Sequence, residues 1–431
     1  MPAETGYARR NGASVSRAFR RDKPAGSRGE IMERIWITGI GAATPLGFTY
    51  RDIADNLLAG RSGVRTIEQF DASRHTCRFA GVLGTFPTSE EDDATPRTRY
   101  EQLLDWCIRQ ALVDAGLWNE RAELRIGIVG GLGAEWLQVW ERDWEIGGDL
   151  IHRTDVSPSS QLESTRRRLG LSGPVASVGA ACASGNVAVT QARRWLRQGW
   201  VDVCIAGGFD LPVTPLGLAG FGNLGALSKR NDSPSEASRP FDRDRDGFVI
   251  SEGGVAFVME NETRARQRGV RAWAEVAGVG AKSDGAHLVI PSSDPVPAST
   301  AIRQALRDAG ENPAAVDYVN AHATSTPVGD PFEVQALRTV FGASLPEIPV
   351  SSTKGASGHL LSAASAFETL ACIVALERRA IPPTINLHAV DPACEVHHVP
   401  HHAIDRKVRL AVNNSFGFGG SNTCVVLRKV A

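Results

Sequence analysis

One cysteine lies where an apolar strand is expected to give way to a helix. Residues 177–185 (SVGAACASG) place Cys182 among small side chains just behind that strand. A thiol at the start of a helix lies near the positive end of the helix dipole, which favours the thiolate and makes the sulfur a nucleophile. An inert buried cysteine is the alternative. We favour that alternative for Cys204 and Cys424, which lie inside expected strands.

Two further segments each place a histidine close behind an expected strand. Residues 319–330 (VNAHATSTPVGD) hold His322 among hydroxyl groups, and residues 351–361 (SSTKGASGHLL) hold Lys354 and His359 among small residues. A histidine in such a place can donate a hydrogen bond to a reacting carbonyl or carry a proton. Taken alone, His322 fits a structural role equally well. The residue order of a phosphate-binding loop is absent around Lys354.

A glycine-rich segment, residues 413–422 (NNSFGFGGSN), connects the last two expected strands. Glycine freedom can place backbone N–H groups around an oxyanion and can let an aromatic ring swing. A plain hairpin turn is the alternative. We assign a function to this segment only in combination with the segments 177–185, 319–330 and 351–361.

Short apolar segments of strand length alternate with expected helices along the whole chain, which indicates a layered α/β architecture. The triplet Ala-Ser-Gly occurs behind a strand at 183–185 and again at 356–358, which suggests a duplicated fold with helix starts facing a shared centre. The expected strands lie at residues 35–40, 126–129, 175–178, 201–206, 273–279, 316–320, 348–351, 408–412 and 423–427.

The charges of the chain nearly cancel, with 47 Lys and Arg residues against 48 Asp and Glu. Such a chain lacks the global positive field that drives nucleic-acid binding, so an anionic partner must be held by a local patch. No apolar run is long enough to span a bilayer, and the seven cysteines show no metal-ligand spacing. We therefore expect a cytoplasmic protein that binds no metal, nucleic acid or membrane and carries a flexible basic tail at residues 1–32.

Together, the order and spacing of these segments resemble the β-ketoacyl synthases of the thiolase superfamily. The similarity is greatest to the elongating type II fatty-acid enzymes and their polyketide relatives, and it runs from about residue 36 to 427. It includes residues 39–41 (GIG), 226–228 (ALS), 230–232 (RND), 239–242 (RPFD) and 245–248 (RDGF). The resemblance implies a thiolase-like duplicated five-layered αβαβα fold. Its N-terminal half, residues 33–265, would hold the cysteine, and its C-terminal half, residues 266–431, both histidines.

The resemblance also implies roles in carbon–carbon bond formation. Cys182 would accept an acyl group, and His322 with His359 would assist decarboxylation of a malonyl thioester. Lys354 would orient the site. The supporting carboxylates would be Glu333, Asp330 and Glu368, with Lys354 tied to Glu333 or Asp330.

Binding roles follow from the same resemblance. The backbone N–H groups of Cys182 and Phe418 would form an oxyanion hole, and Phe418 would gate the acyl pocket. Thr324 and Thr326 would contact phosphopantetheine. Two further assignments are carrier docking at Arg230 with Lys229 and an acyl-pocket wall at Trp136. Trp136 begins a stripe with Trp140 and Trp144 that is expected on one face of a helix at 134–146, where core packing is the alternative.

The implied partner is an acyl carrier protein, and the implied assembly is a homodimer or a heterodimer with a chain-length-factor-like subunit. No cofactor is expected, because loss of CO₂ drives the step. A non-catalytic partner subunit is the alternative function, which the intact Cys182, His322 and His359 disfavour. A degradative thiolase-like enzyme is a third reading, although the last glycine-rich segment lacks the second cysteine of that group. The pathway, fatty-acid or specialised polyketide and polyene synthesis, stays open.

Overall fold

The apolar segments pair into one ten-stranded mixed sheet with the order β10-β9-β13-β14-β8-β1-β7-β6-β4-β5. The computed structural model describes residues 33–87, 97–148 and 161–430, so the expected tail at 1–32 lies outside the described residues. The strands of this sheet are β1 (Ile35–Ala43), β4 (Ile126–Leu132), β5 (Val175–Val178), β6 (Val203–Asp210), β7 (Gly253–Asn261), β8 (Ala274–Ser283), β9 (Tyr318–Asn320), β10 (Val350–Ser351), β13 (Leu410–Gly417) and β14 (Ser421–Arg428).

Two small sheets and a set of helices complete the described fold. The small sheets pair β2 (Val64–Thr66) with β3 (Phe79–Gly81) and β11 (Ala380–Ile381) with β12 (Ile404–Asp405). The helices are α1 (Tyr50–Leu58), α2 (Arg99–Asp114), α3 (Leu137–Glu145), α4 (Gln161–Arg168), α5 (Ser184–Arg197), α6 (Pro215–Asn223), α7 (Glu262–Gln267), α8 (Val296–Asp308), α9 (Gly329–Phe341), α10 (Lys354–Ser357) and α11 (Ala364–Arg378). No helix within these ranges is long and apolar enough to cross a membrane.

The large sheet is internally duplicated. Its first half runs β5-β4-β6-β7-β1 and its second half β10-β9-β13-β14-β8, so that both halves place their strands in the same chain order: third, second, fourth, fifth, first. In each half two parallel pairs are followed by two antiparallel pairs. The duplicated α/β architecture that we expect is therefore confirmed. The boundary at residue 265 stays a prediction, and the chain beyond Met32 forms one compact unit.

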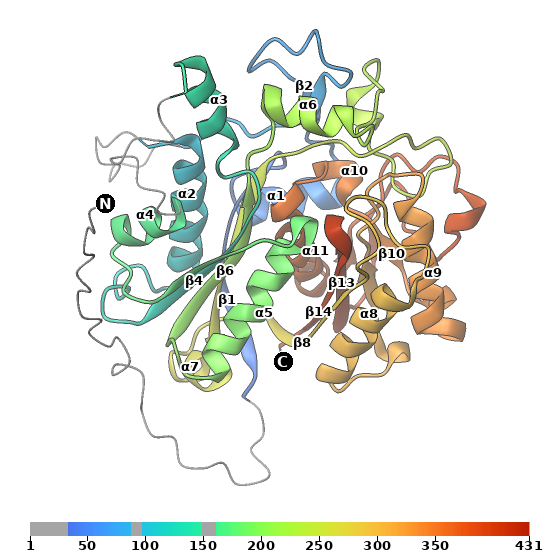
Figure 1. The fold of residues 1–431 in the computed structure, drawn as a ribbon. Helices are drawn as coiled ribbons and strands as arrows, with labels where there is room; N and C mark the ends of the chain where they lie inside the picture. Colours follow the sequence, from blue (N-terminus) through green and yellow to red (C-terminus); the bar gives the residue numbers. More distant parts are fainter. Residues whose placement is uncertain (1–32, 88–96, 149–160, 431) are drawn as a thin grey trace, which may run out of the picture. The chain divides into compact units, whose positions relative to one another are not determined.

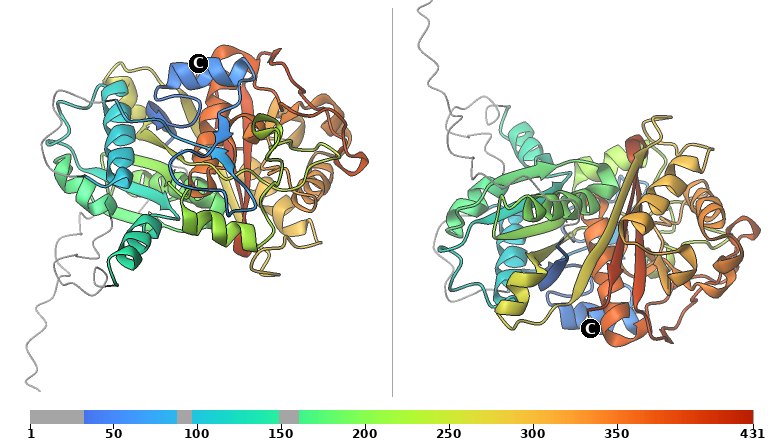
Figure 2. Two further views of the ribbon diagram at one scale, coloured as in Figure 1. Left: turned by 90° about the horizontal axis from the view of Figure 1, so that it is seen from above. Right: turned by 90° about the horizontal axis from the view of Figure 1, so that it is seen from below.

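The two half-sheets face each other across a shared helix layer. β1 and β8 join them through only two residue pairs, Trp36 with Glu275 and Ile37 with Ala274. α5 and α11 contact strands of both halves, whereas α2 packs on β1 and β7 and α8 packs on β8 and β14. Helix, sheet, helix, sheet and helix therefore follow one another, with α5 and α11 in the middle layer (Figures 1 and 2).

A repeated Gly-x-Gly motif lets the outer helices approach the sheet. A Cβ atom at Gly39 or Gly41 in β1 would lie 2.2 or 1.9 Å from carbonyl oxygens of α2. Gly278 and Gly280 in β8 meet α8 in the same way, at 2.1 and 2.0 Å. Only glycine permits such contact between strand and helix backbones. Each half therefore uses the same device in its first strand.

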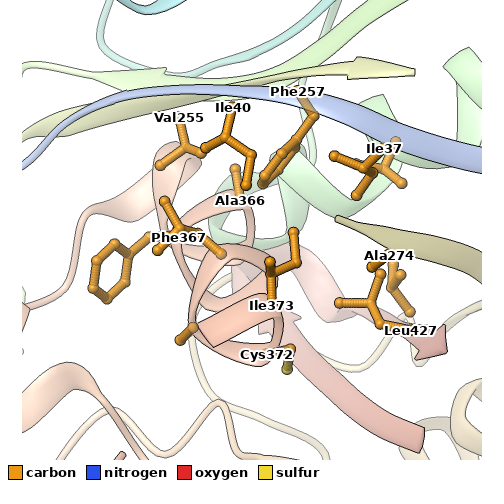
Figure 3. Close-up of a cluster of buried hydrophobic side chains, with 14 of the residues drawn as sticks. Ile37, Ile40, Val255, Phe257, Ala274, Ala366, Phe367, Cys372, Ile373 and Leu427 are labelled. Atoms are coloured by element: carbon orange, nitrogen blue, oxygen red, sulfur yellow. The ribbon is translucent and has the colours of Figure 1, made fainter. Parts of the chain in front are cut away.

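The core is centred on α11, which is buried from Ala364 to Leu376 on all sides. A helix whose apolar residues are spread over all its sides belongs inside a protein rather than on its surface. Figure 3 shows side chains of β1 and β7 above those of α11, including Ile40, Phe257, Phe367 and Ile373. This packing fixes the N-terminal end of α11 beside that of α5, where the polar segments of the sequence gather.

Candidate active site

Cys182 lies in a tight turn between β5 and α5. A 3₁₀ turn spans Ala181–Ala183, and Ala181 has the left-handed φ of 48°. The hydroxyl of Ser184 pins this turn, since it accepts a bond from the N–H of Ala180 (2.9 Å) and donates to the carbonyl of Ala181 (2.7 Å). The thiol is thus placed at the start of α5, as the sequence predicts, with 6% of the residue exposed.

Burial raises the pKa of the Cys182 thiol to about 12. The Lys354 ammonium and the backbone N–H groups of Phe418 and Cys182 act in the opposite direction but do not outweigh burial. With its pKa raised by burial, the resting sulfur is a thiol near pH 7. Both N–H groups act on Sγ. They can therefore stabilise a negative charge that develops beside the sulfur by hydrogen bonding.

His359 is the immediate neighbour of the thiol. Its Nε2 atom lies 3.0 Å from Cys182 Sγ, and its backbone N–H donates to the carbonyl of Val249 (2.7 Å). Gly358 precedes it with a φ of 69°, a conformation that favours glycine and turns the chain toward the sulfur. Phe248 packs edge-on against the imidazole at a centroid distance of 5.3 Å. These contacts hold the ring against Cys182.

His322 follows β9 and meets the same space from the other half of the fold. Its ring lies 5.5 Å from the His359 ring between centroids, at an angle of 79°. Its backbone N–H and that of Ala323 donate to the Glu333 carboxylate at 3.0 and 2.7 Å. Burial first, and then the nearby Lys354, lower the pKa of both histidines well below the usual value. Both imidazoles are therefore neutral near pH 7.

Lys354 pairs with Glu368 and not with Glu333 or Asp330, so the expected partner was wrong. Its ammonium donates to Glu368 of α11 and to the carbonyl of His322, and it lies 3.4 Å from His322 Nδ1. Glu333 is instead engaged by backbone N–H groups, and Asp330 accepts the N–H of Phe241 (2.8 Å). Because an ammonium group only donates, Nδ1 of His322 acts as an acceptor, which leaves the proton on Nε2.

The three carboxylates behind the histidines are fully buried, and burial raises the pKa of each. The pKa of Glu333 rises to about 7 and that of Asp330 to about 6, although several backbone N–H groups act against the shift. Burial also raises the pKa of Glu368 to about 7, against the attraction of Lys354. These groups support the site from behind, since none of them lines the cavity in front of the thiol.

A cavity of about 1120 Å³ opens in front of the thiol. Glycine-rich residues 413–422 form a hairpin between β13 and β14, with Gly417 opposite Ser421, and this hairpin is also part of the wall. The predicted residues that line the cavity are Cys182, His322, His359, Phe418, Thr324, Thr326 and Trp136. The structure thus brings catalytic, gate, pantetheine and acyl-pocket candidates to one space.

The two docking candidates lie outside this cavity. Lys229 is exposed and Arg230 half-buried, and the N–H of Lys229 donates to Asp246, which lines the cavity (2.9 Å). Trp140 also lines the cavity, whereas Trp144 is 70% exposed and does not. The expected helix is observed as the shorter α3, and Trp136 lies just before its first residue.

Asp210 and Ser362 line the cavity without having been predicted. Asp210 ends β6 and accepts hydrogen bonds from both the N–H and the hydroxyl of Ser362, and burial raises its pKa to about 6. Ser362 lies in a second 3₁₀ turn, Leu361–Ala363, that opens α11 with a φ of 46° at Leu361. This turn, and not residues 356–358 as expected, is the counterpart of the Cys182 turn. In the sequence, the only sign of this turn was Ser362 itself, a polar residue that follows the last residue of α10 by five positions.

The side-chain ligand atoms of Cys182, His322 and His359 lie within 4.8 Å of one another, a spacing that a metal ion can share. It is the one group of this kind among the residues that the structure describes. The sequence-based expectation of a metal-free site stays a prediction.

Comparison with known proteins agrees with this geometry. Models of the β-ketoacyl synthase N-terminal and C-terminal domains match residues 32–265 and 273–388. The 3-oxoacyl-[acyl-carrier-protein] synthase 2 of Coxiella burnetii is 37% identical over 410 residues, covering 92% of this chain and 99% of that protein. One matching structure is described as a type II polyketide synthase acyl-carrier protein in complex with its ketosynthase bound to the hexaketide. A chain of that structure matches with a TM-score of 0.84 and 29% identity, and the match covers 92% of this chain and 100% of that chain. The ishigamide ketosynthase/chain length factor matches with a TM-score of 0.84 and 30% identity, covering 93% and 100%.

These matches define the class of the protein, and the chain belongs to the β-ketoacyl synthase family. Its fold is the thiolase-type fold that the sequence predicts. The chain is, more particularly, an acyltransferase of the β-ketoacyl-synthase type.

Proposed function

We propose that the chain condenses a malonyl group on an acyl carrier protein with an acyl chain bound to Cys182, releasing CO₂. One observation carries the proposal: the Cys182 thiol, 3.0 Å from His359, shares a cavity with the neutral His322 ring. A nucleophile beside a proton acceptor, facing a second donor, is the arrangement that acyl transfer followed by condensation needs.

The acyl group is first transferred to the sulfur. Because burial keeps Cys182 protonated, the lone pair of His359 Nε2 takes the thiol proton as Sγ attacks the carrier thioester. The oxygen that becomes negative lies against the N–H groups of Cys182 and Phe418. The C–S bond to the carrier then breaks, and the departing carrier thiolate takes the proton from His359.

The condensing carbanion forms in the second step. The malonyl carrier loses CO₂, and the electron pair of the broken C–C bond becomes an enolate. His322 carries its proton on Nε2 and donates it to the enolate oxygen. Once Cys182 is acylated, it has no thiol proton to give to His359 Nε2, and among the described residues His359 Nδ1 has no hydrogen-bond partner. The neutral His359 ring can then carry its own proton on Nε2 and donate to the same oxygen. The enolate carbon attacks the acyl-cysteine carbonyl, the C–S bond breaks, and the Cys182 thiolate takes up one proton from water, which the reaction consumes. The proposed reaction uses no metal or redox cofactor, since CO₂ release drives it.

The proposed partner is an acyl carrier protein, which docks near Arg230 and Lys229 and inserts its phosphopantetheine past Thr324 and Thr326. One of the structural neighbours is described as a ketosynthase complex with its acyl-carrier protein, which supports this proposal. We propose a homodimer, with a heterodimer containing a chain-length-factor-like subunit as the alternative. The cytoplasm is the proposed compartment, because a reducing environment keeps Cys182 as a thiol.

Intact-mass measurement tests the proposal. Incubation with a hexanoyl carrier protein should add one hexanoyl group to this chain, and Cys182→Ser should lose the rapid thioester adduct. A chain that stays unmodified while a second subunit becomes acylated would instead support the non-catalytic partner role.

A further inference from the structure

Arg245 lies behind the cavity wall and is almost fully buried, with 3% of its side chain exposed. It belongs to residues 239–247, here called the strap, which is hydrogen-bonded to the loop 324–329 and ends in two residues, Asp246 and Gly247, that line the cavity. Arg245 itself does not line the cavity, whereas Thr324 and Thr326 in that loop do. An arginine placed in this way acts on a ligand only through the loop that it holds.

The strap binds three consecutive carbonyl groups of the loop. The N–H of Gly247 donates to Ser325 O (3.1 Å), Arg245 Nε donates to Thr326 O (2.9 Å), and a terminal nitrogen of Arg245 donates to Pro327 O (3.1 Å). The planar guanidinium reaches two adjacent carbonyls at once, which a lysine ammonium on a flexible stem does not reproduce. Two of the three carbonyl groups are therefore oriented by one rigid guanidinium group.

This orientation decides where the hydroxyl groups point. Ser325 has a left-handed φ of 69°, and its hydroxyl accepts the N–H of Arg239 (3.0 Å), so Ser325 faces the strap. Thr324 and Thr326, on either side, face the cavity with their hydroxyl oxygens 3.1 Å apart. A non-glycine residue keeps a left-handed conformation only where its surroundings impose it. Without the strap, the two hydroxyls lose this fixed pair geometry.

Charge fixes Arg245 in place as well. Its guanidinium lies 2.8 Å from Asp391 and 3.5 Å from the buried Asp330. Asp330 in turn accepts the backbone N–H of Thr326 (3.3 Å). Arg245 and Asp330 therefore hold Thr326 at its carbonyl and at its N–H.

We propose that Arg245 is a positioning residue for the pantetheine arm, which it serves by presenting the Thr324 and Thr326 hydroxyls as a fixed pair to the amide groups of the arm. The inference rests on the proposed function and assigns a determinant of substrate affinity that makes no contact with substrate. Its signature is a loss of preference for pantetheine thioesters without a loss of reactivity at the thiol.

The test compares loading of Cys182 from hexanoyl-pantetheine and from S-hexanoyl-2-mercaptoethanol, which lacks the arm. Arg245→Lys keeps the charge between the two carboxylates but cannot bond both carbonyls. We expect it to raise KM for hexanoyl-pantetheine about tenfold or more, the size of a lost charge-assisted hydrogen bond. The maximal rate, loading from the short thioester and alkylation of Cys182 by iodoacetamide should stay unchanged. Arg243→Lys is the matched control, since Arg243 lies in the strap with its side chain 67% exposed.

Two results would overturn the proposal. One is an unchanged preference for hexanoyl-pantetheine in Arg245→Lys, and the other is an equal slowing of both thioesters and of alkylation, which would mean that Arg245 only supports the fold. If Arg245→Lys does not fold, Asp391→Asn decides, because it removes the half-exposed anchor of Arg245 and should shift KM in the same direction by a smaller factor. A wild-type enzyme without preference for the arm would instead remove the assignment of Thr324 and Thr326.

Discussion

At Cys182, burial and the surrounding positive charge act on the thiol in opposite directions. The sequence placed this residue at a helix start, and from that position alone a low pKa is expected. The structure adds what the sequence does not contain, namely that the sulfur is enclosed by residues from both halves of the fold. Burial therefore raises the pKa to about 12, and reactivity depends on the nearby His359.

The pH dependence of alkylation follows from this raised pKa. Below the pKa, the thiolate fraction grows with pH, so the rate of Cys182 alkylation by iodoacetamide should rise roughly tenfold per pH unit between about pH 7 and about pH 9. Intact-mass kinetics measure the rate, and Cys182→Ala gives the background from the other six cysteines, all of which are buried. A rate that levels off below about pH 7 would show that the helix dipole prevails.

The two histidines should separate in their effect on acyl loading. His359 lies next to Sγ and takes its proton, whereas His322 contacts Lys354 through Nδ1. We expect His359→Ala to slow acyl transfer to Cys182 by about 10²-fold and His322→Ala to leave it nearly unchanged. Both variants should lose malonyl decarboxylation. Single-turnover loading followed by mass spectrometry distinguishes them, and equal loading in both variants would contradict the assigned proton transfer.

At the scale of elements, most of the site could be predicted because its residues follow strand ends. Each expected strand overlaps an observed one, and in this sheet the ends of β4, β6, β9 and β13 all supply cavity residues. β7 was missed, although it is buried along its length in the same way as β1, β4 and β6, which were predicted. The partner of Lys354 was also missed, since three buried carboxylates lie on either side of it in the sequence, at Asp330, Glu333 and Glu368, and only the packing of α11 selects Glu368.

Trp136 gives α3 its role in the proposed acyl pocket. It lines the cavity just before the helix begins, so its indole occupies space that an acyl chain would otherwise fill. Trp136→Ala should extend the accepted acyl chain by several carbons with little loss of stability. The matched control is Trp144→Ala, because Trp144 is 70% exposed and lies outside the cavity wall. Turnover over a series of acyl carriers measures the limit, and a lower melting temperature with unchanged chain length would identify Trp136 as a packing residue.

Over the whole molecule, duplication explains why the site has two unlike helix starts. The turn at Ala181–Ala183 presents Cys182, and the matching turn at Leu361–Ala363 presents Ser362, whose hydroxyl is bonded to Asp210. The repeated Ala-Ser-Gly triplet indicated a duplication, but it aligned residues 183–185 with residues 356–358 instead of with the turn at Leu361–Ala363. The better signal was the Gly-x-Gly of residues 39–41 and 278–280, because close packing of a strand on a helix imposes those glycines in both halves.

Carrier binding should depend on charge at the molecular surface. Among the residues that the structure describes, no lysine or arginine lines the cavity, so an acidic carrier must be attracted from outside it, and Arg230 is the candidate. Arg230→Glu should raise the apparent KM for a carrier-bound substrate about tenfold at low ionic strength, and the effect should shrink at high salt. Arg51→Glu, on the highly exposed α1 side chain, is the control. An unchanged KM at low salt would exclude Arg230 from the docking surface.

The central claim is that Cys182 carries the acyl chain, while decarboxylation of the malonyl group depends on the two histidines and does not need the thiol. The most direct measurement follows CO₂ release and β-ketoacyl formation together from malonyl and acyl carrier proteins. For Cys182→Ala the account predicts no condensation product but continued decarboxylation, because both histidines remain, and for Cys182→Gln decarboxylation at least as fast. Condensation at the wild-type rate in either variant would contradict it.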